Sequence, residues 1–397
     1  MKHHKFIPSL HIRSIIILSF IVISGISSAE QTPINSRNAL TTSPKAYEAL
    51  GNTFAKAIKK KDTDTLVQLF DMKRFANIAA RTVFDSKNNI DQFVTGILRN
   101  KEENFLNQIF SAVFRTNANV KFLRVLKGKR PLIRIDYPEG GHEYVILYTK
   151  KLSDNKLSVV DMLFLSSGKK LSLSLGSASQ LLLRPSKSVL KKLFGKNEVD
   201  EKLLKSFKEI TRLRKSNQHK DAYNLIGSLP DTVKNQRVLI DLSIQLAQLI
   251  NDDEYRKQLS RLDKYYGKDE TTTFILIDHH YFNKNYDKAI VSVNRLIDIY
   301  GEDGALLNLI SGTYHIANDN VNAKLFARKA IKSEPQFEDA YWTLVTVLLA
   351  TQEFRDVIQT LNMLEKKFDY AFTAEVFQGN EVYQDFVKSS EFKAQFL

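Results

Sequence analysis

Apolar positions in the second half of the chain repeat with a period of 34 residues. Such self-similarity indicates stacked supersecondary units, each burying its apolar edge against its neighbours. The pattern predicts an all-α repeat domain over residues 199–397, with about five helical hairpins and a C-terminal cap after Leu364. Four sets of positions keep the period: Leu242, Leu276, Ile310 and Leu344; Tyr255, Ala289, Ala323 and Val357; Leu259, Val293, Ala327 and Leu361; Leu262, Leu296, Ala330 and Leu364.

The first half changes from helical to strand-like patterning. Leu50, Phe54 and Ala57 mark an amphipathic helix, and helical spacing continues to about residue 115. Short apolar runs then alternate with turn signals at residues 137–141 and 154–155. This order predicts an α+β domain over residues 45–183, with helices packed on a curved antiparallel sheet of about four strands. Residues 171–183 fit a helix or a strand, and a helix is favoured. Residues 184–198 are predicted to be a linker.

One repeat carries a recognisable set of residues, namely Leu307, Ile310, Ser311, Tyr314, Ala323, Ala327, Ala330 and Pro335. Their types and spacing resemble those of the tetratricopeptide repeat family, although no repeat has the family's first Trp or its Gly. The resemblance implies a solenoid of helical hairpins. It also implies that the first helix of each hairpin lines a concave groove for a peptide or a partner helix.

The groove face of those first helices can be read from the sequence as three triplets, each spaced i, i+4, i+7. Aromatic side chains supply contact area there, and polar ones supply directional bonds. The alternative is that some of these side chains pack against the next repeat or the cap. The triplets are Phe274, Asp278 and Tyr281; Asn308, Gly312 and His315; Trp342, Thr346 and Leu349. The predicted partner-binding residues are Phe274, Asp278, Tyr281, Asn308, His315, Trp342 and Thr346.

Helices followed by antiparallel strands over residues 45–183 resemble the nuclear transport factor 2-like fold. That resemblance implies a pocket between the sheet and the helices. No Asp–His pair of the catalytic kind could be matched to the family. A second function is therefore open, in which the domain binds a small ligand or lipid and the repeats support it. The expected apolar lining is Phe93, Ile97, Ile133, Val145 and Leu163.

The N-terminus has the layout of a secretory signal peptide over residues 1–29, followed by a flexible leader over 30–44. Lys2, Lys5 and Arg13 come first, residues 14–26 are apolar, and small residues follow at 27–29. The alternative is an uncleaved anchor, although the run is shorter than the ~20 residues of a membrane span. We expect an exported, periplasmic protein with no transmembrane span once the signal is removed.

The composition limits the classes of partner that the protein is expected to bind. The chain of 397 residues has 58 Lys and Arg against 44 Asp and Glu, and it has no Cys. The missing Cys excludes disulfides, thiolate metal sites and an N-terminal lipid anchor. An exported basic protein has little access to nucleic acid, so we expect a protein or peptide partner, with an anionic envelope surface as a further candidate.

Catalytic chemistry finds little support in the sequence. Residues 166–169 satisfy S-x-x-K and residues 153–155 satisfy S-D-N, but their order is reversed and K-T-G is absent. His279 and His280 are adjacent, and adjacent side chains on a helix point about 100° apart, so they rarely share a metal. We predict no catalytic residue, no metal and no cofactor. The leading hypothesis is a non-enzymatic adaptor.

Overall fold

The computed structural model describes residues 43–99, 102–152, 156–182 and 200–397 of the chain. The predicted signal peptide, nearly all of the leader, and the predicted linker lie outside these residues. By compactness the described residues form two units, 43–279 and 280–397, with the boundary inside one helix.

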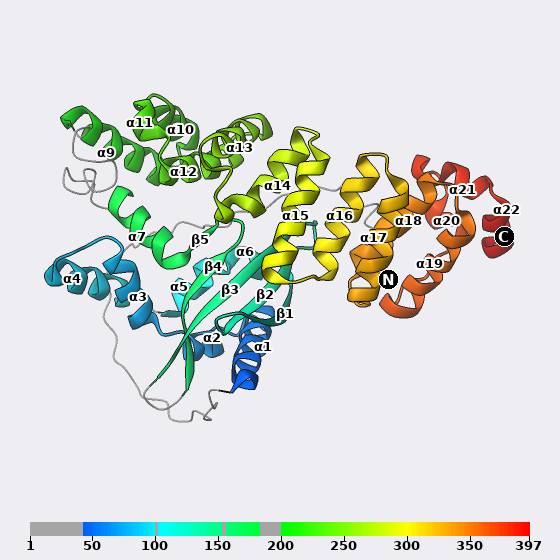
Figure 1. Ribbon diagram of the computed structural model, residues 1–397, viewed down its shortest axis with the longest axis horizontal. Helices are drawn as coiled ribbons and strands as arrows, with labels where there is room; N and C mark the ends of the chain where they lie inside the picture. The colour runs from blue at the N-terminus through cyan, green and yellow to red at the C-terminus, as the bar shows by residue number, and fades with distance from the viewer. Residues whose placement is uncertain (1–42, 100–101, 153–155, 183–199) are drawn as a thin grey trace. The chain divides into compact units, whose positions relative to one another are not determined.

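The first unit begins with short helices that lie against a sheet (Figure 1). Asp62 and Asp71 cap the second and third helices by accepting hydrogen bonds from the backbone N–H groups of Thr65 and Arg74. The helical region predicted to run to about residue 115 is divided into six helices. The six helices are α1 (Pro44–Lys60), α2 (Thr63–Leu69), α3 (Met72–Arg81), α4 (Lys87–Leu98), α5 (Glu102–Ile109) and α6 (Ser111–Thr116).

Five antiparallel strands follow, each paired with its neighbour in the sequence. The predicted antiparallel sheet is confirmed, with a short fifth strand in addition. Irregularities in register between Phe122 and Arg124 and between Tyr148 and Thr149 mark bulges, which bend a strand. The strands are β1 (Asn119–Leu126), β2 (Arg130–Asp136), β3 (His142–Lys151), β4 (Leu157–Phe164) and β5 (Lys169–Lys170).

The two faces of the sheet differ in what they bury. Ile133 and Val145 face the apolar core formed with the N-terminal helices. Leu163 lies opposite Ile146 and therefore on the other face, because directly paired residues share a face. The lining predicted for a ligand pocket is thus divided between the two faces. At Gly51 of α1, an added Cβ would lie 2.4 Å from the Phe122 ring, so only glycine allows this close approach to β1.

Helices complete the first unit. Residues 171–182 form a helix, which confirms the favoured interpretation of that segment. The remaining helices pack in consecutive pairs, such as α12 with α13. They are α7 (Leu171–Leu182), α9 (Glu201–Lys215), α10 (His219–Gly227), α11 (Asp231–Lys234), α12 (Arg237–Gln248), α13 (Asp252–Tyr266), η1 (Glu270–Thr272) and α14 (Thr273–Phe282), the last of which contains the boundary between units.

The second unit keeps the period of the sequence in its backbone. Helices α15, α17 and α19 begin 34 residues apart, and so do the turns before them, where Lys284, Asn318 and Gln352 adopt positive φ. The four periodic sets of apolar positions are all buried, as predicted. The elements are α15 (Tyr286–Tyr300), α16 (Gly304–Ile316), α17 (Asn320–Ser333), α18 (Glu338–Ala350), α19 (Phe354–Phe368), α20 (Ala374–Phe377), η2 (Glu381–Tyr383), α21 (Gln384–Lys388) and α22 (Ser390–Phe396).

The last four elements pack an aromatic cluster against the end of the helical array. Phe377 is in ring contact with Tyr383, Phe386, Phe392 and Phe396, at centroid distances of 5.1–5.9 Å. This cluster belongs to the same apolar core as α18 and α19. The end of the array is therefore covered by apolar contact with residues that follow the last period.

Candidate functional site

Two of the predicted partner-binding residues lie in the interior of the first unit. Phe274 is 8% exposed, and its ring meets Tyr144 of β3 edge-on at 5.8 Å. Asp278 is fully buried and accepts a hydrogen bond from the Tyr255 hydroxyl at 3.2 Å. Burial, together with this carboxylate, raises the pKa of Tyr255. Both side chains thus contribute to packing and internal bonding, with partners on β3 and α13 and not on the next repeat or the cap.

The other five predicted residues lie in the second unit. On α16, Asn308 is 9% exposed, and within the described part of the chain its Oδ1 atom has no hydrogen-bond partner. Two turns further along the same helix, half-buried His315 places Nδ1 at 2.8 Å from Asn320 Oδ1. A buried acceptor without a partner is costly, by about 1–3 kcal/mol. Asn308 is therefore the most informative of the predicted residues.

Trp342 on α18 occupies the position one period after Asn308, and it lies in an aromatic group. Tyr370 and Phe372, which follow α19, meet its ring edge-on at 5.5 and 5.9 Å. They stack on each other at 5.4 Å, and the Trp342 Nε1 atom donates to Glu338 at 3.4 Å. Sequence reasoning missed these two residues because they lie after the last periodic position.

Thr346 and Tyr281 are half-buried. The Thr346 hydroxyl donates to the Trp342 carbonyl at 2.9 Å, one helical turn earlier. The ring of Tyr281 meets Phe282 and Tyr286 edge-on, and burial raises the pKa of its hydroxyl to about 12. Four predicted residues therefore share two helices: Asn308 and His315 on α16, Trp342 and Thr346 on α18.

A charged network that the sequence analysis missed crosses β2 and β3. Arg134 is fully buried, and its guanidinium holds both Asp136 carboxylate oxygens at 2.7 and 3.0 Å. His142 places Nδ1 at 2.8 Å from the same carboxylate. Burial acts to raise the pKa of Asp136, but the hydrogen bond from His142 and the charge of Arg134 outweigh it and hold that pKa well below its usual range. The sequence did contain a sign of the Asp136–His142 pair, since a turn at residues 137–141 places residues 136 and 142 opposite each other.

A second buried group lies beside this network. The Glu143 carboxylate accepts hydrogen bonds from the backbone N–H groups of Tyr144 and Ser166, at 2.8 and 3.2 Å, and from the Ser166 hydroxyl. Burial raises the pKa of Glu143 to about 7, although these hydrogen bonds oppose the shift. Ser166 is thereby committed to Glu143, whereas Lys169, the other member of the S-x-x-K motif, pairs with Asp241. The two motif residues have different partners and form no catalytic arrangement.

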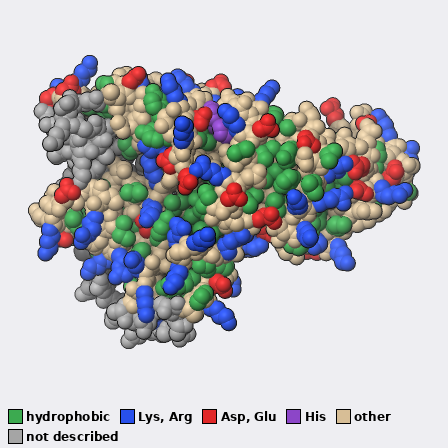
Figure 2. Space-filling view, viewed as in Figure 1, with side chains coloured by type: hydrophobic (Ala, Val, Ile, Leu, Met, Phe, Trp, Pro, Cys, Tyr) green, Lys and Arg blue, Asp and Glu red, His purple; other side chains and the backbone are tan. Residues whose placement is uncertain are grey.

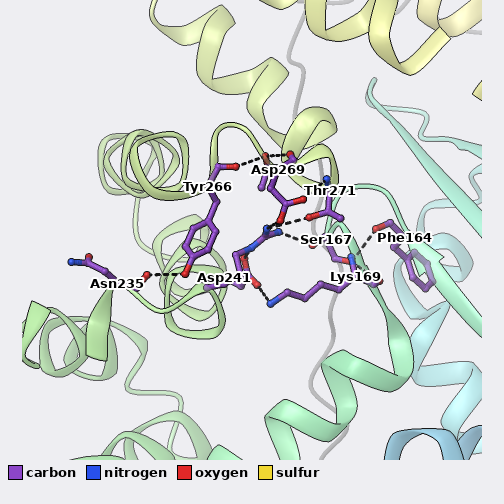
Figure 3. Close-up of polar contacts among 10 residues, drawn as sticks. Phe164, Ser167, Lys169, Asn235, Asp241, Tyr266, Asp269 and Thr271 are labelled. Atoms are coloured by element: carbon purple, nitrogen blue, oxygen red, sulfur yellow. Dashed lines mark hydrogen bonds and ion pairs between the residues drawn. The ribbon is translucent and has the colours of Figure 1, made fainter. Parts of the chain in front are cut away.

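Polar contacts join the sheet of the first unit to its helices at α12 and η1 (Figure 3). Arg237 donates to Asp241 at 2.8 Å, to the Thr271 hydroxyl at 3.3 Å and to the Ser167 carbonyl at 3.4 Å. Lys169 of β5 forms an ion pair with the other oxygen of Asp241. We call this group the Arg237 cluster, defined by Ser167, Lys169, Arg237, Asp241 and Thr271. Its bonds are all internal, so it acts as a structural connection.

Three general features bear on chemistry. Among the described residues, no group of three or more His, Asp or Glu side chains could hold a metal ion. His279 Nε2 lies 3.4 Å from Asp263. Within the described ranges, His279 and His280 belong to no group of three side chains that could hold a metal ion. None of the helices in the described part of the chain has both the length and the apolar character needed to cross a membrane.

Comparison with known proteins adds no assignment. No protein-family model matches the chain, and no curated protein matches it. Function must therefore be argued from the residues themselves.

Proposed function

We propose that the chain is an exported, non-enzymatic adaptor that binds an extended peptide segment of a protein partner across α16 and α18. The helices of the second unit would belong to a solenoid of the tetratricopeptide type, and the peptide would lie on its concave face. The observation that carries the proposal is Asn308, whose buried Oδ1 has no partner within the described residues.

An extended peptide could satisfy this atom directly. Each peptide residue other than proline offers a backbone N–H donor, and a donor placed at Asn308 would remove the cost of the unpaired oxygen. Trp342 lies at the equivalent position one repeat later, where its aromatic group could hold an apolar side chain of the same peptide. The exported location rests on the layout of residues 1–29.

Asn308→Leu tests the proposal, because it keeps the approximate shape and removes the unpaired oxygen. If this oxygen accepts a hydrogen bond from the partner, the variant without partner should be more stable than the native chain by about 1 kcal/mol, and its affinity for the partner should fall. A purely structural role for Asn308 predicts the opposite sign for stability. Thermal unfolding and photo-crosslinking measure the two effects.

The crosslinking is designed around the same two helices. A photoreactive residue at Thr346 should capture a defined partner from an envelope extract, and Asn308→Leu should abolish that product. The matched control places the photoreactive residue at Leu325 of α17, which is 48% exposed. Equal capture from both positions, or capture that survives Asn308→Leu, would contradict the proposal.

A further inference from the structure

One end of the sheet gathers three segments that are distant in the sequence. The β1–β2 turn and the end of β3 lie together, since the Thr149 hydroxyl donates to the Lys129 carbonyl at 3.4 Å and Arg130 lies 3.5 Å from the Tyr148 hydroxyl. The start of α1 joins them, because the Lys129 ammonium lies 5.7 Å from the centre of the Tyr47 ring. The β1–β2 turn therefore lies between the first turn of α1 and the end of β3.

This end of the sheet is strongly basic, and we call it the basic end. Within the described residues, none of the cations that define it forms an ion pair with a carboxylate. All are exposed except Arg130, which is half-buried. Figure 2 shows Lys and Arg side chains around this part of the molecule, at the lower left. The defining residues are Lys45, Lys127, Lys129, Arg130, Lys150 and Lys151.

Acidic residues are scarce in the same segments. The described stretches 126–130, 148–152 and 156 contain no Asp or Glu, and the first residues of α1 contain one, Glu48; Asp154 lies outside the described residues. By contrast, Lys324 and Arg328 of the second unit each pair with a carboxylate on the following hairpin. The uncompensated charge is thus a local property of the basic end. Mutual repulsion makes such a cluster unfavourable unless an anionic partner offsets it.

Aromatic contacts hold part of the cluster in place. The Tyr148 ring contacts the guanidinium of Arg130, at 5.7 Å from its centre, and the ammonium of Lys170, at 4.0 Å. Cations over an aromatic face lose some of the freedom of a surface side chain. Two charges of the basic end, Lys129 and Arg130, are therefore restrained by aromatic contacts.

The position of α1 indicates which anionic surface lies nearby. The described chain starts at Ser43, so it enters the fold at the basic end. The apolar run at residues 14–26 precedes this point by 16 residues. Sixteen residues span at most about 55 Å, so the chain is long enough for the basic end to reach the bilayer surface when that run is inserted.

We infer that the basic end docks on the headgroups of an anionic phospholipid bilayer. Each Lys or Arg near such a surface strengthens binding about fivefold, and the attraction reaches about one Debye length, roughly 8 Å at physiological salt. Several cations at one end of the sheet, on the β1–β2 turn and at the end of β3, can reach the headgroups together. The inference is independent of the peptide-binding proposal, since none of its residues lies in the second unit.

Vesicle co-sedimentation tests the inference with the chain from Glu30, which keeps every described residue and removes the apolar run. We expect binding to phosphatidylglycerol-containing vesicles, no binding to pure phosphatidylcholine, and release at about 1 M salt, where the Debye length is ~3 Å. Replacing Lys127, Lys129, Lys150 and Lys151 with Gln should weaken binding by roughly several hundredfold. The double variant K150Q/K151Q should show an intermediate loss.

The matched control removes the same charge from another surface. Lys202, Lys205, Lys208 and Lys215 are exposed on α9, and their replacement with Gln should leave vesicle binding nearly unchanged. An equal loss in this control would show that net charge alone drives binding and would overturn the inference. So would equal binding to both kinds of vesicle, or displacement from vesicles by a trace of soluble polyphosphate.

Discussion

At the residue scale, Glu143 should make stability depend on pH near neutrality. Burial raises its folded-state pKa to about 7, above the ordinary value of 4.5. Its contribution is therefore fully present below the ordinary pKa and is lost as the pH rises through 7. Glu143→Gln should remove that loss, so its advantage over the native chain in Tm should be larger at pH 8 than at pH 5, by on the order of 5 °C.

Thermal unfolding of the two chains at both pH values measures this effect, and Glu139→Gln in the hairpin turn is the control, since that side chain is exposed. Parallel pH profiles of Tm for the native chain and Glu143→Gln would contradict a raised pKa of Glu143.

The sequence alone could not have identified Glu143 as a buried carboxylate. Strand alternation places residue 143 on the core-facing side, but only the turn at Ser166 shows that the side chain is covered.

At the element scale, replacing glycine with alanine is expected to have opposite effects on stability at two positions. Gly96 lies inside α4, and an added Cβ would meet nothing within 4 Å, so Gly96→Ala should stabilise the chain by about 1 kcal/mol. Gly168 lies in the turn between β4 and β5 at φ +62°, where an added Cβ would lie 1.9 Å from the Thr271 carbonyl oxygen. Gly168→Ala should destabilise by roughly 1–3 kcal/mol.

Chemical unfolding of the two variants measures both changes in the free energy of unfolding. A stabilising or neutral Gly168→Ala would mean that the turn does not pack closely on η1.

The same comparison shows which elements the sequence could predict. The periodic helices were found because their apolar spacing is local and repeated. The close contact at Gly168 involves residues about 100 positions apart, and no local pattern encodes it.

At the scale of the whole molecule, the sequence predicted the order of sheet and helices. The predicted linker at 184–198 lies outside the described residues, and the compact unit that contains the sheet runs to residue 279. The physical reason lies in contacts between distant segments. Phe274, predicted for the groove, packs on Tyr144, and Arg237 bonds to the Ser167 carbonyl. Helical periodicity identifies an apolar face, but it does not say which neighbour covers that face.

These contacts predict that the chain holds together after it is cut between the sheet and the helices. A protease site inserted at residues 184–198 should yield two fragments that co-elute in size-exclusion chromatography, because apolar burial and the Arg237 cluster join them. Arg237→Ala would leave Asp241 with Lys169 alone and remove the bond to Ser167, so the cut variant should separate at lower denaturant concentration. Arg212→Ala, which removes an exposed pair with Glu209 on α9, serves as the control and should change little. Fragments that separate at once without denaturant would show that the sheet and the helices are independent bodies.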